Sequence, residues 1–214
     1  MYFKEVLVIY LSCFCVSVFT QDDMRCLDMK PPRNFALSEI MGLYFVVQIV
    51  HHRDDGRNKG TATVDSCPLV QLTRDGRSVT LLWNEQAGHV QYLFTVPNVE
   101  TNPGFWMSTG PQNVTVIPGS MLQKAYRQFA GTVQVVIVAK NHVVLTFCSP
   151  NSDLYSVVLS RDQKMRRVDL FEINEMLIKK DLKEVGIKEA CRDSASSVTS
   201  SLLVLIAVFA VSRL

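Results

Sequence analysis

The sequence predicts an all-β fold, either a sandwich or a closed antiparallel barrel, followed by one amphipathic helix. Three observations carry this prediction. Short extended runs alternate with turn residues from Leu43 to Leu159, hydrophobic and polar residues alternate along those runs, and a helical pattern follows them. Strands at this spacing, without helices between them, are typical of antiparallel sandwiches and barrels.

The expected strands are separated by recognisable turns, which include Asp75-Gly76, Gln86-Ala87-Gly88, Asn102-Pro103-Gly104 and Lys140-Asn141. We expect the strands at 43–50, 61–73, 78–84, 89–96, 104–108, 132–139, 142–148 and 154–161. Residues 109–131 show no clear pattern. A long loop, an irregular strand near Val114 to Ile117, or both are expected there.

Alternation along the strands places apolar side chains on one face. The residues that share such a face are Val79, Leu81 and Trp83, then Val90, Tyr92, Phe94 and Val96, and finally Tyr155, Val157 and Leu159. In the expected strands this face carries no charge before Arg161. A small barrel has room inside for side chains or for one small ligand. We therefore predict an apolar cup lined by Leu81, Trp83, Tyr92, Phe94 and Val157, which suits an uncharged or single-headed hydrophobic ligand. A solid core is the alternative.

A helix is expected after the last strand. Asp169-Leu170-Phe171-Glu172 resembles a capping box, and apolar residues follow at Leu170, Ile173, Leu177, Leu182 and Val185. Oppositely charged residues four apart, such as Glu184 and Lys188, support a helix through this region. One apolar stripe predicts packing against the outside of the barrel.

Composition excludes two broad classes of protein. The 214 residues include 22 Lys+Arg and 20 Asp+Glu, the net charge is +2, and 48% of the residues are hydrophobic. A nucleic-acid-binding chain of this size carries a larger basic excess, and a disordered chain carries fewer apolar residues. We expect a folded domain, two at most, and no nucleic-acid partner.

The N-terminus has the pattern of a secretory signal peptide. Lys4 precedes an apolar run from Val6 to Phe19, which is too short to cross a bilayer comfortably. We predict that residues 1–20 are the signal peptide, with cleavage after Thr20. An uncleaved anchor is the alternative.

The C-terminus has the order of a GPI-attachment signal. Small polar residues after Cys191 lead into an apolar tail from Leu202 to Val211, shorter than the roughly 20 residues of a spanning helix. We predict Asp193 or Ser194 as the attachment residue, 21–194 as the mature domain and 195–214 as the removed propeptide. A short transmembrane helix is the alternative. The predicted location is the extracellular face of the plasma membrane.

Cysteine usage agrees with secretion. Of the six cysteines, Cys13 and Cys15 lie in the predicted signal peptide, which leaves Cys26, Cys67, Cys148 and Cys191. Four cysteines in an oxidising compartment predict two disulfides, in any of three pairings. Asn113 begins an N-glycosylation acceptor, Asn113-Val114-Thr115.

Two segments carry motifs of a known family. The first comprises Cys26-Leu27-Asp28, Pro32-Arg33-Asn34-Phe35 and Ile40-Met41-Gly42-Leu43-Tyr44-Phe45, and the second is Leu159-Ser160-Arg161. In these motifs the chain resembles the lipocalin family, and within it the apolipoprotein D/Lazarillo branch, over residues 26 to 191. The resemblance implies an eight-stranded antiparallel up-and-down barrel with one C-terminal α-helix packed outside.

The resemblance also implies roles for particular residues. In lipocalins a Gly-x-Trp opens the first strand, and an Arg from the last strand lies over the aromatic ring at the closed end. Here the corresponding residues are Gly42, Tyr44 and Arg161, so the implied contact is a cation–π stack on tyrosine. The implied disulfides are Cys26–Cys148 and Cys67–Cys191. The Thr-Asp-Tyr motif of the family is absent near Ile137-Val138-Ala139.

The sequence contains no recognisable catalytic motif. It has no Gly-x-Ser-x-Gly, no nucleotide-binding glycine loop and no His-Glu-x-x-His. His51 and His52 are adjacent, so on a strand they face opposite ways and cannot share a metal. We therefore expect neither enzymatic activity nor a metal or cofactor.

These observations predict an extracellular, membrane-anchored protein that carries or presents a small hydrophobic ligand, such as a lipid, sterol, retinoid or fatty acid, in a barrel cavity. The alternative is a cell-surface adhesion, guidance or signalling protein whose loops bind another protein, for example a receptor. The predicted membrane tether is compatible with both.

Overall fold

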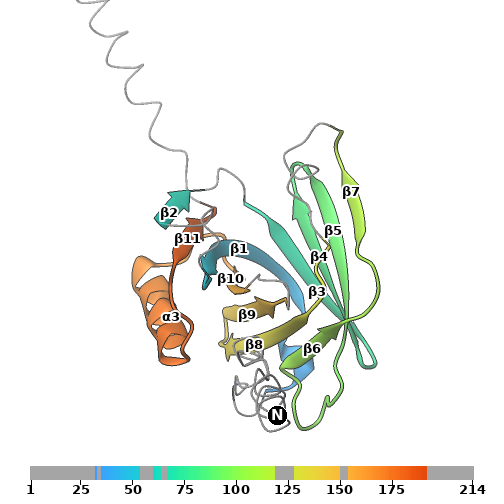
Figure 1. Ribbon diagram of the computed structural model, residues 1–214. Coiled ribbons are helices and arrows are strands. Elements are labelled where there is room, and N and C mark those ends of the chain that lie inside the picture. Colours follow the sequence, from blue (N-terminus) through green and yellow to red (C-terminus); the bar gives the residue numbers. More distant parts are fainter. Residues whose placement is uncertain are drawn as a thin grey trace, which may run out of the picture.

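The computed structural model describes residues 32, 35–53, 60–63, 67–118, 128–149 and 154–191 (Figure 1). A short 3-10 helix, η2 (Leu37–Ile40), precedes the first strand. The strands are β1 (Gly42–His51), β2 (Gly60–Thr63), β3 (Leu69–Asp75), β4 (Ser78–Glu85), β5 (Gly88–Thr95), β6 (Phe105–Ser108), β7 (Asn113–Val116), β8 (Thr132–Val138), β9 (His142–Cys148), β10 (Leu154–Ser160) and β11 (Gly186–Glu189). The helix α3 (Arg167–Lys179) lies between β10 and β11.

Eight of the strands close into an antiparallel barrel. Their order is β10-β9-β8-β6-β5-β4-β3-β1, and pairing of β1 with β10 closes the ring. β6 and β7 share one neighbour, because β6 pairs with the end of β5 and β7 pairs with its beginning. The predicted fold class is therefore confirmed, and an irregular strand is present in the stretch that showed no clear pattern.

The expected strand 61–73 is wrong in extent. It is divided into β2, which pairs in parallel with β11, and β3, which belongs to the barrel. Pro68 immediately precedes β3 and has no N–H to donate to a strand ladder. Its carbonyl accepts a hydrogen bond from the amide of Val46 at 2.9 Å, so the chain enters the barrel wall at this point.

The helix is shorter than expected and starts differently. It begins at Arg167 without a side-chain cap, and the Asp169 carboxylate instead lies 2.6 Å from the Arg166 guanidinium. It ends at Lys179, two residues before Asp181, which has a φ of 63°. A positive φ is incompatible with continuing the helix. The prediction that the helical pattern continues through Leu182 and Val185 is therefore wrong.

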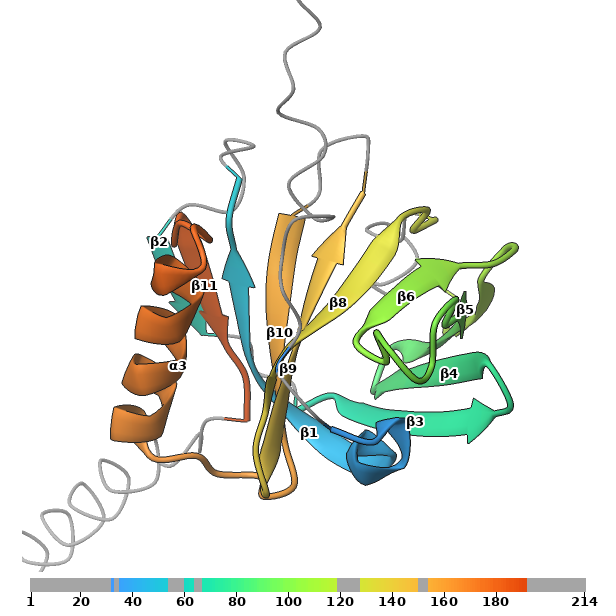
Figure 2. The same ribbon diagram turned by 90° about the horizontal axis from the view of Figure 1, so that it is seen from below.

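The chain after α3 runs along the barrel instead. β11 pairs with β1 through Glu189 and Gly186, opposite Gln48 and His51. Figure 2 shows α3 outside the barrel wall, as predicted. The expected helical pair of Glu184 and Lys188 does not form, because Lys188 lies in a strand.

Two hydrophobic clusters result from the alternation of side chains along the strands. The inner cluster fills the barrel and contains Phe35, Leu37, Ile40, Tyr44, Val46, Val70, Leu72, Val79, Leu81, Phe94, Val96, Trp106, Phe129, Val133, Val135, Val143, Leu145, Phe147, Val157 and Leu159. The outer cluster joins α3 to the wall and contains Val47, Val50, Val136, Ile137, Val144, Cys148, Leu154, Val158, Ile173, Leu177 and Leu182.

One end of the barrel is closed around Tyr44, and we call this end the base. The Tyr44 hydroxyl donates to the Ile40 carbonyl at 3.0 Å, and the Arg161 guanidinium carbon lies 3.9 Å from the centre of the tyrosine ring. Arg161 also donates to the carbonyls of Met41 at 2.7 Å and Leu43 at 3.2 Å. One arginine thus joins the last strand of the barrel to the first.

Gly42 is required by this arrangement. Its φ is +118°, and a Cβ at this position would lie 2.5 Å from Nη1 of Arg161. We expect Gly42→Ala to lower the free energy of unfolding by about 1–3 kcal/mol, because it introduces backbone strain and displaces the guanidinium. Urea denaturation measures the loss. Gly110→Ala is the control, since Gly110 also has a positive φ, +79°, but nothing within 4 Å. Equal losses in the two variants would contradict a role for the Arg161 contact.

Candidate functional site

The inner face of the barrel changes from fully buried to partly exposed along its length. Near the base, Leu72, Phe94 and Trp106 have no exposed surface. Toward the opposite end, where β4 joins β5, Trp83 and Tyr92 are only partly buried against the inner cluster. We call this second end the open end, because the inward side chains of Trp83 and Tyr92 there are partly exposed.

Aromatic side chains are concentrated in the open half. Phe147 stacks on Tyr155 with ring centres 5.0 Å apart, and Phe129 meets Phe147 edge-on at 5.4 Å. Tyr92 meets both phenylalanines edge-on at 6.5 Å, and Phe94 continues the series toward the base. These five rings, the aromatic cluster, come from β5, β9, β10 and the segment before β8. Such contacts present an apolar surface of defined shape.

Gln112 fixes the position of Phe129. The Gln112 side-chain oxygen accepts from the Phe129 amide at 2.7 Å, and the side-chain nitrogen donates to the Phe129 carbonyl. The primary amide thereby takes the place of a strand neighbour and satisfies both backbone groups of a residue that lies outside any strand. The sequence shows no local sign of this contact, which spans 17 positions.

The five predicted lining residues share the inner face but occupy two levels. Leu81, Phe94 and Val157 are fully buried within the inner cluster. Trp83 and Tyr92 lie at the partly exposed level. Solid packing therefore describes the level of Leu81, Phe94 and Val157. Phe129 and Phe147 were missed as site residues, although Phe147 continues the alternation of Val143 and Leu145.

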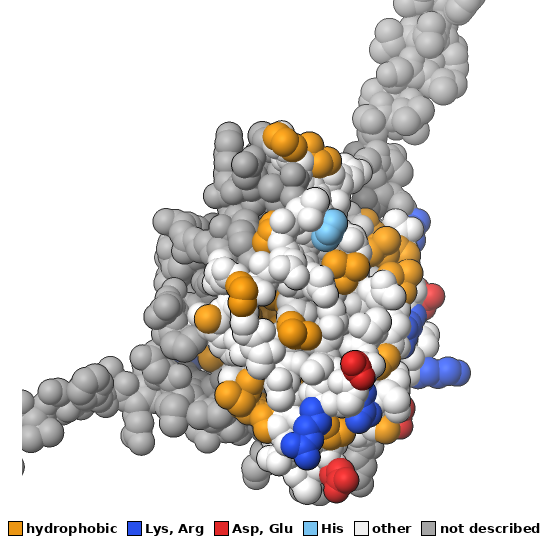
Figure 3. Space-filling view, turned by 90° about the vertical axis from the view of Figure 1, so that its right-hand side faces the viewer, with side chains coloured by type: hydrophobic (Ala, Val, Ile, Leu, Met, Phe, Trp, Pro, Cys, Tyr) orange, Lys and Arg blue, Asp and Glu red, His pale blue; other side chains and the backbone are white. Residues whose placement is uncertain are grey.

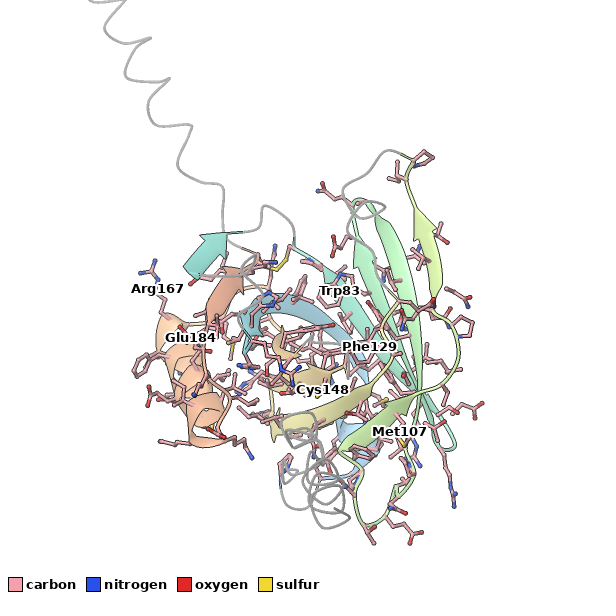
Figure 4. The ribbon with its side chains drawn as sticks, in the orientation of Figure 1. Trp83, Met107, Phe129, Cys148, Arg167 and Glu184 are labelled. Carbon is pink, nitrogen blue, oxygen red and sulfur yellow. A yellow bond between two sulfur atoms is a disulfide. The ribbon has the colours of Figure 1, made fainter. Side chains whose placement is uncertain are left out.

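The inner face also carries a charge that was not expected. β4 extends one residue beyond its predicted end to Glu85, which follows Trp83 on the same face of the strand. The Trp83 indole nitrogen donates a hydrogen bond to the Glu85 carboxylate. Figure 4 shows Trp83 on the interior side of the β3–β5 wall, above Phe129. The statement that the inward faces are uncharged before Arg161 is therefore wrong.

The two adjacent histidines face opposite ways, as expected. The His51 ring lies 6.1 Å from the ring of Tyr155, on the inner side, whereas His52 is buried on the outer side. Within the described ranges, no three His, Cys, Asp or Glu side chains are grouped so that they could bind a metal.

His52 anchors the segment between α3 and β11. Its Nδ1 donates to the Lys183 carbonyl at 2.8 Å, because a carbonyl only accepts. Its Nε2 then accepts from the Ser156 hydroxyl at 2.7 Å, and Ser156 lies 2.7 Å from the hydroxyl of Thr146. This arrangement satisfies a neutral imidazole. Burial lowers the pKa of His52 from 6.5 to about 4, a shift that the Lys183 carbonyl opposes and His51 reinforces.

This pKa shift predicts a pH-dependent stability. Between pH 6.5 and about 4 the unfolded chain binds a proton at His52 that the folded chain excludes. The contribution of neutral His52 to the free energy of unfolding is therefore fully present above pH 6.5. It falls by about 1.4 kcal/mol per pH unit as the pH is lowered through this window. We expect His52→Asn to flatten this part of the pH profile in urea denaturation, and His89→Asn, at an exposed position, to leave it unchanged. A slope that is the same in all three proteins would contradict the assignment.

The outer wall of the barrel offers a different surface. Figure 3 shows hydrophobic side chains on this side of the molecule in small groups separated by polar side chains and backbone. Among the exposed hydrophobic residues of the wall are Leu93 and Met107. The rings of the aromatic cluster lie inside the barrel instead.

The remaining predicted sites are only partly within the described residues. Cys67 and Cys191 are joined by a disulfide. Cys148 is also disulfide-bonded, and Cys26, its partner in the implied pairing, lies outside the described residues. Asn113 is exposed at the start of β7. The predicted signal peptide, Asp193, Ser194 and the C-terminal propeptide also lie outside the described residues. In the described part of the chain, no helix has the length and apolar character of a bilayer span.

Comparison with known proteins identifies the fold. A biogenic amine-binding protein superposes with a TM-score of 0.53 at 10% sequence identity, over 73% of this chain and 81% of that one. The tryptamine complex of the amine-binding protein of Rhodnius prolixus gives a TM-score of 0.54 at 10% identity, over 75% and 83%. The fold is lipocalin-like. The siderocalin Ex-FABP matches with a TM-score of 0.47 at 12% identity, over 73% and 97%. No family model and no curated protein sequence matches the chain.

Proposed function

We propose that this protein binds one small hydrophobic molecule in the open half of its barrel and holds it without chemical change. The observation that carries the proposal is the aromatic cluster, in which Tyr92 and Tyr155 are partly exposed at one end of a barrel that is packed solidly at the other. Two structural neighbours, with TM-scores of 0.53 and 0.54, are named as amine-binding proteins, which supports a small-molecule binding role.

The physical basis for affinity is burial of apolar surface. Each Å² of apolar ligand surface removed from water contributes about 25 cal/mol, and aromatic rings add shape-dependent contacts. Rings held by Gln112 and by stacking are already ordered, so binding loses little side-chain freedom. A lipid, sterol, retinoid or fatty acid fits this surface chemistry, and no bond has to be made or broken.

Tryptophan fluorescence tests this proposal. Titration with a retinoid, a sterol and a fatty acid is expected to quench emission saturably with at least one of them. The quenching is expected to disappear in Trp83→Phe and to persist in Trp106→Phe. Trp83 lies partly exposed at the open end of the barrel, whereas Trp106 is fully buried near the base. Quenching that persists in Trp83→Phe and disappears in Trp106→Phe would place the ligand elsewhere.

The proposed setting is the extracellular face of the plasma membrane, with a GPI anchor at Asp193 or Ser194 after removal of residues 195–214. The order of small residues, polar spacer and short apolar tail supports this. Phosphatidylinositol-specific phospholipase C is expected to release the protein from intact expressing cells. Retention at the surface after this treatment would favour a transmembrane segment.

The outer face of α3 favours a second candidate function, which is binding of another protein. Val168, Phe171 and Ile178 are 52%, 65% and 49% exposed along this helix. Contiguous exposed apolar patches mark interaction surfaces, and these three side chains project from one helix. The double variant Phe171→Glu and Ile178→Glu is expected to abolish binding to partner cells and to leave ligand quenching intact. Cell binding that is unchanged in this variant would exclude α3 as the contact.

A further inference from the structure

Glu85 is set apart from the other acidic residues of the described chain by its position. It is the last residue of β4, on the inward face, and its backbone pairs with Gly88 at the turn into β5. The side chain is partly buried beside Trp83, which packs against the inner cluster. The carboxylate therefore lies at the open end of the barrel, at the level of the predicted ligand.

The negative charge of Glu85 is not neutralised by the described part of the chain. The carboxylate accepts one hydrogen bond, from the Trp83 indole, and no Lys, Arg or His within the described ranges forms an ion pair with it. An indole N–H needs only a neutral acceptor, which a glutamine would supply equally well. Among the described residues, the contact with Trp83 therefore does not require the negative charge.

The surroundings of the carboxylate suit a cation. The Trp83 ring lies beside the carboxylate, and Tyr92 and Tyr155 add partly buried aromatic rings to the same inner face of the barrel. The faces of such rings attract ammonium groups, and tryptophan does so most strongly. A carboxylate beside aromatic rings combines an ion pair with cation–π contacts. The apolar rings deeper in the barrel remain available for the hydrophobic body of the same molecule.

We infer that Glu85 is the counter-ion for a cationic head group, so that the barrel selects an amphiphile with a hydrophobic body and a single positive charge. This inference rests on the proposed function and narrows its ligand class. The hydrophobic body contacts the aromatic cluster, and the cation lies at the open end against the Glu85 carboxylate and the Trp83 ring.

Three probes that share one alkyl chain test the inference: decylamine, decanol and decanoate, titrated calorimetrically into the full mature protein. The expected order of affinity is amine, alcohol, acid, with about a tenfold preference for decylamine over decanol from a partly exposed ion pair and cation–π contact. Glu85→Gln keeps an acceptor for Trp83 and removes the charge. It is expected to bind decanol unchanged and to lose the preference for decylamine.

Glu100→Gln is the matched control, because it removes the same charge from an exposed position between β5 and β6, near the base. It is expected to keep the preference. Equal binding of decylamine and decanol by the unaltered protein would overturn the inference and leave the proposed function standing. A preference for decylamine that survives in Glu85→Gln would have the same consequence. Failure of all three probes and of the retinoid, sterol and fatty acid panel would overturn both.

Discussion

Replacing Trp106 with alanine is expected to lower the free energy of unfolding by about 4 kcal/mol. The side chain has no exposed surface, its ring centre lies 6.0 Å from that of Phe94, and its indole nitrogen donates to the Pro103 carbonyl at 2.8 Å. Alanine leaves a large cavity at the packed level of the barrel and an acceptor without its donor. Urea denaturation followed by far-UV circular dichroism measures the loss.

Trp83→Ala is the matched comparison, because it removes the same side chain from the partly exposed level. We expect a smaller loss there, about 1–2 kcal/mol, since less apolar surface returns to water. Losses of equal size would contradict the division of the barrel into a packed base and an open half.

Removing the Cys67–Cys191 disulfide is expected to lower stability by about 5 kcal/mol, because the bridge closes a loop with a sequence separation of 124 residues. The bridge joins the residue before Pro68 to the residue two positions after β11. β11 has only four residues and is held to β1 and β2 by backbone pairing. The disulfide adds a covalent link that holds the end of this short strand near the start of β3.

The double variant Cys67→Ala and Cys191→Ala avoids free thiols and allows the loss to be measured. Hydrogen exchange is expected to accelerate at the β11 amides more than at β4 and β5, which lie on another part of the wall. Uniform acceleration across the barrel would show that the bridge acts on the whole fold rather than on its C-terminal segment. Stability equal to that of the unaltered protein would contradict the expected contribution.

The barrel strands were predictable because their hydrophobic pattern is local. The period of two in β4, β5 and β10 appears in the sequence and fixes which side chains face inward. Glu85 was missed because that pattern stops at Trp83, while backbone pairing with Gly88 continues the strand. A polar residue at a strand end resembles a turn residue when sequence alone is considered.

Two other errors arose where long-range contacts determine structure. Glu184 and Lys188 are oppositely charged and four apart, which favours a helix locally, yet Lys188 lies in β11, which pairs with β1 and β2. Phe129 belongs to the site because Gln112 binds its backbone, and no periodicity marks such a contact. Contacts between residues that are distant in the sequence therefore determine both features, and the local hydrophobic pattern does not show them.

The arrangement as a whole separates the residues that close the barrel from those that we propose to bind a ligand. Arg161, Tyr44 and the buried rings near the base hold the barrel closed, whereas Trp83, Tyr92 and Glu85 at the open end contribute less to packing. Side chains of the second group are therefore free to be selected for a ligand.

Native mass spectrometry of the mature domain, ending at Ser194 and purified from secreting eukaryotic cells, most directly tests whether the barrel holds a ligand. We expect the folded protein to carry one small molecule per chain, or to take up one after incubation with hydrophobic amines, lipids and sterols. That molecule is expected to be lost from Phe129→Ala, in which the aromatic cluster is opened. A folded protein that stays empty throughout, or that takes up ligands without a fixed stoichiometry, would contradict binding in the barrel.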